Sequence, residues 1–245
     1  MNNDIQVTWL GHSTFRIETE GKTILIDPWV MGNPACPENQ KHFNKLDLMF
    51  CTHGHFDHIG DAVALCKKHQ PKVVGIFELC AWLEKKGAKN TMPMNKGGTQ
   101  TVEGLKITMV HADHSCGIKE DDGSIVYGGE PCGYVIEFPN GLKLYHAGDT
   151  NVFGDMHIIR ELYAPEVAML PIGDLFTMGP REVEYACGLL RPKVVIPMHF
   201  GTFPALTGNS KELEQVAEDL AIHVMVMKPG ERKPLSVPQL APVGK

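Results

Sequence analysis

The sequence predicts an α/β protein in which short strands and amphipathic helices alternate. Residues 47–86 read as strand, helix, strand and helix in turn, and a similar alternation returns after residue 142. A chain of 245 residues with 43% hydrophobic residues can bury a substantial core. Sequence motifs with candidate functional roles are spread from Trp9 to His199, so we expect one domain over residues 1–245.

The first half of the chain is predicted to open with an antiparallel meander and to continue with parallel strands. Expected strands, rich in β-branched and aromatic residues, lie at 5–9, 14–19, 23–27, 47–52, 72–76, 101–103 and 105–110. Expected helices lie at 61–69 and 78–86. Pro28 cannot extend a β ladder, so Asp27 should end its strand at the sheet edge and anchor the loop after residue 52.

The second half contains one hairpin and then alternating strands and helices. Pro139-Asn140-Gly141 between two apolar runs is typical of a hairpin turn. Expected strands lie at 133–138, 142–146, 167–170, 194–197 and 223–227. Expected helices lie at 155–163, 180–190 and 210–221, with Asn209 and Glu212 placed to cap the last one.

Two long segments are expected beside the site, and the first of them, residues 28–44, lacks helical or strand periodicity. Residues 28–44 contain Gly32-Asn33-Pro34 and Pro37, and a loop of this length in a compact protein is usually functional. We expect it to form one wall of a pocket. Residues 115–132 are rich in glycine and acidic residues, and we expect a flexible flap beside the site there.

The most informative stretch is His53-Gly54-His55-Phe56-Asp57-His58, which directly follows a predicted strand. In an extended or turning backbone, side chains two residues apart project to the same side, so His53, His55 and Asp57 can converge while His58 points from the next position. Imidazole and carboxylate together suit zinc and its first-row neighbours. The absence of cysteine from the cluster argues against a structural thiolate site.

The His-x-His-x-Asp-His pattern resembles the signature of the metallo-β-lactamase superfamily. The phrases Trp9-Leu10-Gly11-His12-Ser13-Thr14-Phe15, Asp27-Pro28-Trp29 and Leu170-Pro171-Ile172-Gly173 are similar to a branch of metal-dependent hydrolases. That branch is related to ascorbate-6-phosphate lactonase and, more distantly, to N-acyl phosphatidylethanolamine phospholipase D. The resemblance covers residues 5 to 230 and implies a four-layer αβ/βα sandwich with one or two metals at one edge.

The resemblance also implies three further metal ligands, in the order His, Asp and His. His114, Asp149 and His199 occupy these places, and the family pattern Ala-x-His-Ser favours His114 over the nearby His111. The implied ligands for one metal are His53, His55 and His114. Those for the other are Asp57, His58 and His199, with Asp149 bridging. The implied cofactors are two divalent ions, with zinc favoured and manganese, iron or nickel as alternatives.

The function implied by this resemblance is hydrolysis of an ester, lactone or phosphate-ester bond of a small substrate by a metal-bridging hydroxide. Asp57 and Asp149 would act through the metals. His12 would be a proton donor or supporting residue in the pocket, or else a structural histidine in a tight turn. His146 would orient the loop that carries Asp149.

Other functions stay open as alternatives. These are a class B-like β-lactamase or amide hydrolase, and a phosphodiesterase or nuclease. A redox enzyme of the flavo-diiron type would carry Glu in place of His55 and a flavodoxin domain. A metal-binding protein without catalysis would usually have lost ligands.

Composition narrows the partners and the compartment. The net charge is −6 and no long run of Lys or Arg occurs, so we expect no nucleic-acid partner. Seven scattered cysteines without a paired motif favour reduced thiols in the cytoplasm. Residues 1–4 carry no basic or apolar leader pattern, and no apolar run approaches the ~18 residues needed to span a membrane. A homo-oligomer stays open.

Overall fold

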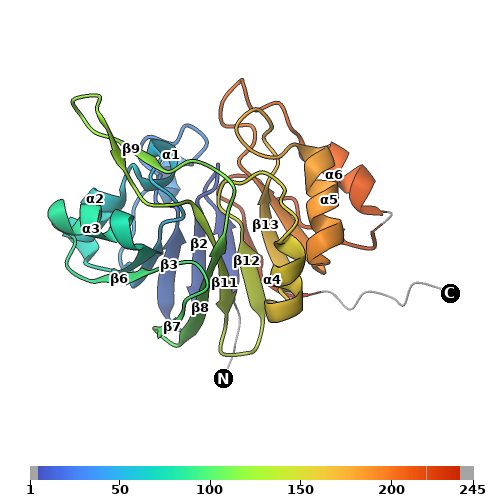
Figure 1. The fold of residues 1–245 in the computed structure, drawn as a ribbon, viewed down its shortest axis with the longest axis horizontal. Helices are drawn as coiled ribbons and strands as arrows, with labels where there is room; N and C mark the ends of the chain where they lie inside the picture. Colours follow the sequence, from blue (N-terminus) through green and yellow to red (C-terminus); the bar gives the residue numbers. More distant parts are fainter. Residues whose placement is uncertain (1–4, 219, 238–245) are drawn as a thin grey trace.

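Two seven-stranded sheets lie side by side in the middle of the computed structural model, which describes residues 5–218 and 220–237 (Figure 1). The strands of the first sheet are β1 (Gln6–Trp9), β2 (Phe15–Thr19), β3 (Lys22–Ile26), β4 (Leu48–Phe50), β5 (Lys72–Ile76), β6 (Thr91–Met94) and β16 (Arg232–Pro234). Those of the second are β7 (Thr99–Val102), β8 (Leu105–His111), β11 (Cys132–Glu137), β12 (Lys143–His146), β13 (Val167–Pro171), β14 (Val194–Met198) and β15 (His223–Val224).

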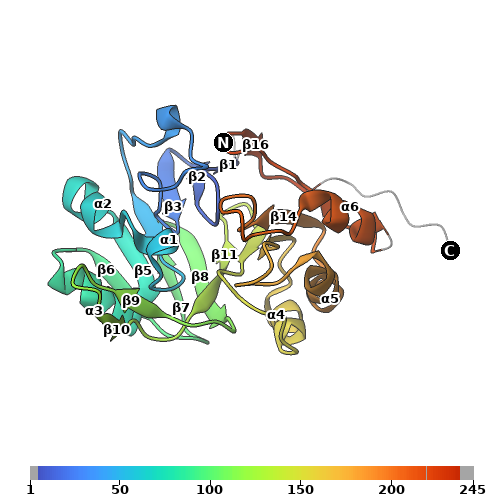
Figure 2. The same cartoon turned by 90° about the horizontal axis from the view of Figure 1, so that it is seen from above.

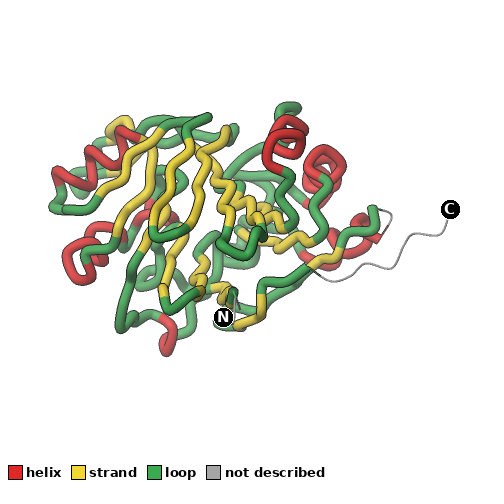
Figure 3. Tube along the Cα trace, turned by 90° about the horizontal axis from the view of Figure 1, so that it is seen from below, coloured by secondary structure: helices red, strands yellow, loops and turns green. Residues whose placement is uncertain are grey.

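Helices flank the two sheets on opposite sides, as Figure 2 shows from above. The helices near the first sheet are α1 (Phe56–Ile59), α2 (Ala62–His69) and α3 (Phe77–Lys85). Those near the second are α4 (Met156–Tyr163), α5 (Pro180–Leu190) and α6 (Ser210–Glu218). The α/β class and the four-layer αβ/βα arrangement expected from the sequence are confirmed. Figure 3 shows the strands of both sheets between the two groups of helices.

The directions of the strands explain where functional side chains can lie close together. The first sheet has the order β16-β1-β2-β3-β4-β5-β6, antiparallel from β16 to β3 and parallel from β3 to β6. The second has the order β15-β14-β13-β12-β11-β8-β7, parallel from β15 to β12 and antiparallel from there on. Strands β1, β3 and β4 therefore run the same way, as do β8, β12, β13 and β14. Loops after these strands share one edge of their sheet.

The core lies between the sheets and beneath the helices. Every residue of β4, β13 and β14 is buried, which fits the uninterrupted apolar runs of these interior strands. The Oη atom of buried Tyr134, on β11, donates a hydrogen bond to the carbonyl of Cys51 at 2.7 Å. Because Cys51 directly follows β4, this bond joins the two sheets across the core.

Most expected strands and helices occur within a few residues of the predicted bounds. The predicted helix over 210–221 spans Ser210–Glu218, and residue 219 lies outside the described residues. Its expected cap is present, since Asn209 Oδ1 accepts the backbone N–H of Glu212 at 3.1 Å. The strand expected at 223–227 is limited to His223–Val224.

Two strands were not predicted because each contains a proline. Pro93 lies in β6 and Pro234 in β16, and each of these strands is at an edge of the first sheet. Proline removes a ladder donor and is tolerated at an edge. Pairing with β5 and β1 therefore makes strands of segments whose local sequence is weakly β-like.

The segment 115–132, which was expected to be a flexible flap beside the site, has regular structure and borders the cavity over the site. This segment contains the two-stranded hairpin of β9 (Gly117–Lys119) and β10 (Ile125–Tyr127). Glu120 at its turn accepts hydrogen bonds from Trp82 Nε1 at 2.8 Å and Lys86 Nζ at 2.6 Å, both from the α3 region. These contacts fasten the hairpin to the first sheet's helices. The 28–44 loop contains one 3-10 turn, Glu38–Gln40.

Within the described residues, every helix is too short or too polar to cross a membrane. The expectation about residues 1–4 lies outside the described residues.

The inter-sheet bond of Tyr134 makes a testable prediction about stability. Tyr134→Phe should lower the free energy of unfolding by about 1 kcal/mol, because the Cys51 carbonyl loses its donor in the core. Tyr145→Phe is a matched control, since the buried Oη of Tyr145 has no hydrogen-bond partner in the structure. The control should leave stability unchanged or slightly raised. Urea denaturation of both variants measures the difference, and equal losses would contradict the assignment.

Candidate metal centre

The expected ligands converge at one edge where the two sheets meet. His53, His55, Asp57 and His58 follow β4 of the first sheet, in the turn that leads into α1 and in α1 itself. His114, Asp149 and His199 follow β8, β12 and β14 of the second sheet. The centre is thus assembled from loops at the ends of strands in both sheets.

The first group of imidazoles contains the three histidines expected for one metal. His55 Nδ1 lies 2.9 Å from His53 Nε2 and 3.3 Å from His114 Nε2. One ligand atom from each of the three lies within 4.8 Å of the others. His111, the alternative to His114, instead lies at the surface, where its Nδ1 is 3.3 Å from Lys96 Nζ and its ring contacts Phe153.

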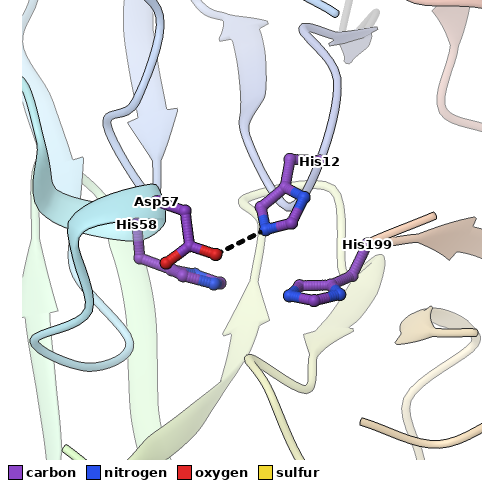
Figure 4. Close-up of side chains that lie close together, drawn as sticks. All are labelled: His12, Asp57, His58 and His199. Carbon is purple, nitrogen blue, oxygen red and sulfur yellow. Dashed lines mark hydrogen bonds and ion pairs between the residues drawn. The ribbon is translucent and has the colours of Figure 1, made fainter. Parts of the chain in front are cut away.

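The second group contains Asp57, His58 and His199 and, in addition, His12 (Figure 4). His12 Nε2 lies 2.9 Å from Asp57 Oδ2, the interaction drawn in Figure 4. The ring of His12 packs on that of His199 with centroids 3.9 Å apart. The other nitrogen of His12 lies 3.1 Å from Thr202 Oγ1. His12 is therefore a full member of this cluster.

Asp149 lies between the two groups. Its Oδ2 atom is 2.9 Å from His199 Nε2 and 3.2 Å from His58 Nε2. The same oxygen is 3.8 Å from His114 Nε2 and 3.9 Å from His53 Nε2. One buried carboxylate oxygen thus faces histidines of both groups.

Asp27 holds the first-sheet ligands from behind. Its Oδ1 accepts the backbone N–H of Thr52 at 2.8 Å, and its Oδ2 accepts the Thr52 hydroxyl at 2.8 Å. The same Oδ2 lies 2.7 Å from His58 Nδ1. Asp27 is fully buried and contacts the ligand loop from behind, as an anchor rather than as a member of either group.

These contacts determine which nitrogens are available to a metal. The Thr52 hydroxyl gives its proton to Asp27, so its oxygen is left to accept from His53 Nδ1, 3.0 Å away. His58 Nδ1 donates to Asp27. The Nε2 atoms of His53 and His58 then face the centre, which is the usual way in which neighbouring groups orient a ligating histidine.

The electrostatics of the centre favour neutral imidazoles in the first group. Burial lowers the pKa of His53 well below its usual value, and it also lowers the pKa values of His55 and His114. Neutral imidazole is the form that ligates metal. Burial lowers the pKa of His12 to about 4 as well, although the hydrogen bond with Asp57 opposes the shift.

The second group contains the charged partners. Burial opposes charge on His58, but Asp149 and Asp27 outweigh it and raise the pKa of His58 well above its usual value. Burial likewise favours the neutral acid of Asp149, yet His199 and His58 hold its pKa well below the usual range. Asp57 has a lowered pKa as well, because the hydrogen bond from His12 and the charge of His58 outweigh its burial. Two carboxylates are thus ionised at the centre.

The donor set fits a metal. The buried Nε2 atom of His58 makes no hydrogen bond, although Asp149 Oδ2 is only 3.2 Å away. The two atoms therefore face each other as an ion pair without a well-aligned hydrogen bond, and a cation between them would be coordinated by both. Neutral imidazoles with ionised carboxylates are also the ligands that zinc and its neighbours prefer.

Three residues at the centre have a strained backbone. His12, Asp27 and His199 have φ angles of 57°, 50° and 57°, in the left-handed region that costs a non-glycine residue about 1–3 kcal/mol. The His12 carbonyl accepts two donors, the Trp9 indole at 2.8 Å and the His199 backbone N–H at 3.0 Å. These bonds hold the loops after β1 and β14 together.

Supporting residues include some that the sequence did not indicate. His146, which was expected to orient the loop that carries Asp149, is buried, with Nε2 3.2 Å from the Ser13 carbonyl and Nδ1 accepting the Gly148 N–H at 3.2 Å. It therefore connects the His12 turn with the loop that carries Asp149. Thr52 precedes His53 directly, which is a weak signal for its role. Thr202 carried no signal, because its contact with His12 is formed by distant segments.

A cavity of about 740 Å³ opens over the centre. Its floor is formed by expected ligands, among them His55, Asp57, His114 and Asp149. The expectation that residues 28–44 form one wall is wrong, because none of them lines this cavity. Trp29 of that loop lies instead against the ring of Phe203, with centroids 5.8 Å apart.

Comparisons with known proteins agree with this geometry. The β-lactamase superfamily domain matches residues 6–199. A UPF0173 metal-dependent hydrolase of Koribacter versatilis is 62% identical in an alignment that covers 93% of this chain and 97% of that protein. A UPF0173 metal-dependent hydrolase of Solibacter usitatus is 52% identical, and the alignment covers 93% of this chain and 98% of that protein. Among solved structures, a metallo hydrolase of the archaeon Ignicoccus hospitalis is 38% identical and covers 95% of this chain and 99% of its own, with a TM-score of 0.83. The chain therefore belongs to the metallo-β-lactamase superfamily, within the UPF0173 family of metal-dependent hydrolases.

Proposed function

We propose that this protein uses two divalent metal ions to hydrolyse an ester, lactone or phosphate-ester bond of a small molecule. The observation that carries the proposal is the position of Asp149 Oδ2 between histidines of both groups. A single carboxylate oxygen in that place suits a bridge between two ions. His53, His55 and His114 would hold one ion, and Asp57, His58 and His199 the other.

Two ions in this site would acidify a shared water molecule and polarise the substrate oxygen. The side chains of the chain itself supply what such a pair requires. Asp57 and Asp149 carry negative charge that offsets the repulsion between two cations. Zinc fits the imidazole and carboxylate donors, and manganese, iron or nickel could take the same set.

His12 has a positioning role in this proposal. Its Nε2 is hydrogen-bonded to Asp57 and its Nδ1 is hydrogen-bonded to Thr202, so both ring nitrogens have a hydrogen-bond partner. A neutral imidazole that donates to Asp57 and accepts from Thr202 fixes the rotamer of that carboxylate.

We further propose a cytoplasmic location, because all seven cysteines are free and buried.

The first prediction concerns metal content. Purified protein should bind about two first-row metal ions per chain, measured by elemental analysis after dialysis against buffer without metal. The loaded protein should hydrolyse at least one member of a panel of carboxylic esters, lactones and phosphodiesters, with a β-lactam tested as the alternative. Binding of only one ion per chain at saturation would refute the dinuclear proposal. Turnover of the β-lactam alone would show that the substrate is an amide of the β-lactam type rather than an ester.

The second prediction separates the two neighbouring histidines. His114→Ala should weaken metal binding and reduce kcat by at least about a hundredfold, since even supporting residues of metal sites are worth 10–100-fold. His111→Ala is the matched control and should keep both, because His111 lies at the surface beside Lys96. Metal titration and steady-state kinetics measure the pair. Equal losses in the two variants would refute the assignment of His114.

The third prediction tests the bridge. Asp149→Asn preserves shape but removes the charge that faces both groups, so the second ion should bind more weakly and kcat should fall by about a hundredfold or more. Asp113→Asn is the control, since Asp113 is exposed near the site and lies outside both groups. Calorimetric titration would count the ions in each variant. An Asp149→Asn protein with two tightly held ions and near wild-type turnover would show that Asp149 does not bridge.

A further inference from the structure

The cavity over the metal centre has a polar floor and apolar walls. Beyond the expected ligands, its lining consists mostly of aromatic and aliphatic side chains. They come from four separate parts of the chain: Phe56 on α1, Ile125 on the β9–β10 hairpin, Phe176 on the loop after β13, and Phe203 and Leu206 on the loop after β14. A concave apolar site with a few convergent polar groups is the usual form of a small-molecule pocket.

Three of these wall residues are unusually exposed for large apolar side chains. The exposed fractions are 60% for Phe56, 60% for Phe176 and 75% for Ile125. Single exposed apolar residues need no explanation, but apolar side chains gathered around a functional centre mark a surface to be covered. The cavity that they enclose ends on the ligands, so the molecule that covers them also reaches the metal centre.

The chain holds Phe176 in place through a strained turn. Asp174 and Leu175, two consecutive non-glycine residues, have φ angles of 64° and 55°. The turn is closed by Asp174 Oδ1, which accepts the Leu175 N–H at 2.7 Å, and by the Asp174 N–H, which donates to the Met178 carbonyl at 3.0 Å. Strain of this kind persists where the surrounding structure requires a particular placement.

The opposite wall is fastened by different contacts. The hairpin that carries Ile125 is held at its turn by Glu120, which accepts from Trp82 and Lys86 of the α3 region. The strained turn before Phe176 and the hydrogen bonds of Glu120 thus keep apolar side chains on facing sides of one cavity. Lys119 is the only cationic side chain in the lining, and it is exposed.

We propose that this cavity binds an apolar acyl or alkyl group of the substrate, beside the bond cleaved at the metal centre. The inference rests on the proposed hydrolytic function and narrows it to substrates with a hydrophobic arm. A sugar or a nucleotide would need many hydrogen-bonding partners, whereas Ser115 and Lys119 are the polar side chains of the lining outside the expected ligands.

A binding experiment on metal-depleted protein tests the cavity without catalysis. Straight-chain alcohols from butanol to decanol would displace the fluorescent probe 1-anilinonaphthalene-8-sulfonate. Affinity should rise about threefold to fourfold for each added methylene until the chain fills the cavity, as burial of one CH₂ predicts. Affinity that does not depend on chain length would overturn the proposal.

Matched variants locate the binding. Phe176→Ser and Ile125→Ser should each weaken decanol binding by about tenfold, because part of an apolar wall is lost. Phe77→Ser is the control, since Phe77 is also 60% exposed but lies outside the cavity lining. Circular dichroism checks that each variant is folded. An equal effect of Phe77→Ser would place the binding elsewhere and refute the assignment.

Kinetics of the metal-loaded protein then separates the two proposals. With p-nitrophenyl esters from acetate to decanoate, kcat/KM should increase with chain length, and Phe176→Ser should flatten the increase. Ester turnover that is insensitive to chain length would defeat the apolar-arm proposal and leave the hydrolytic function standing. Graded alcohol binding with no turnover of any ester, lactone or phosphate ester would defeat the hydrolytic assignment while the apolar cavity stands.

Discussion

The metal centre depends on the hydrogen bonds that the buried carboxylate of Asp27 accepts. Asp27 lies at the end of β3, with left-handed backbone, and its two oxygens accept from the Thr52 backbone, the Thr52 hydroxyl and His58 Nδ1. Through Thr52 it also determines the tautomer of His53. A buried charge is stable only with several such partners. The network that stabilises Asp27 is therefore the same network that orients two of the expected ligands, His53 and His58, toward the centre.

Much of this centre could be predicted from sequence because its ligands follow strands directly. The spacing of His53, His55, Asp57 and His58 carries local information, since side-chain direction alternates along an extended backbone. Asp149 and His199 were expected from the family resemblance, and the rule that loops after strands of one direction share an edge agrees with that expectation. The contact of His12 with Asp57 could not be derived in this way. It depends on how the turn after β1 packs against α1, which no local pattern encodes.

The 115–132 segment was expected beside the site, but the sequence did not indicate which apolar side chains line the cavity, for the same physical reason. Ile125, Phe176 and Phe203 are separated by dozens of residues and meet only after both sheets are formed. The apolar character of each is ordinary by itself. Edge strands β6 and β16 were missed because their prolines weaken the local signal, while neighbouring strands supply the pairing. Tertiary contacts thus decide both the outer margins of the fold and the outer margins of the site.

The division of the centre between two sheets has a consequence for assembly. Four expected ligands follow β4 of the first sheet, and three follow β8, β12 and β14 of the second. Under the proposed ligand assignment, neither half alone supplies all the ligands of either ion, so tight binding would require both halves to be docked. A cation that binds the docked state and not the undocked one stabilises it by mass action. In that arrangement, the available metal concentration would help to determine how firmly the two sheets are held together.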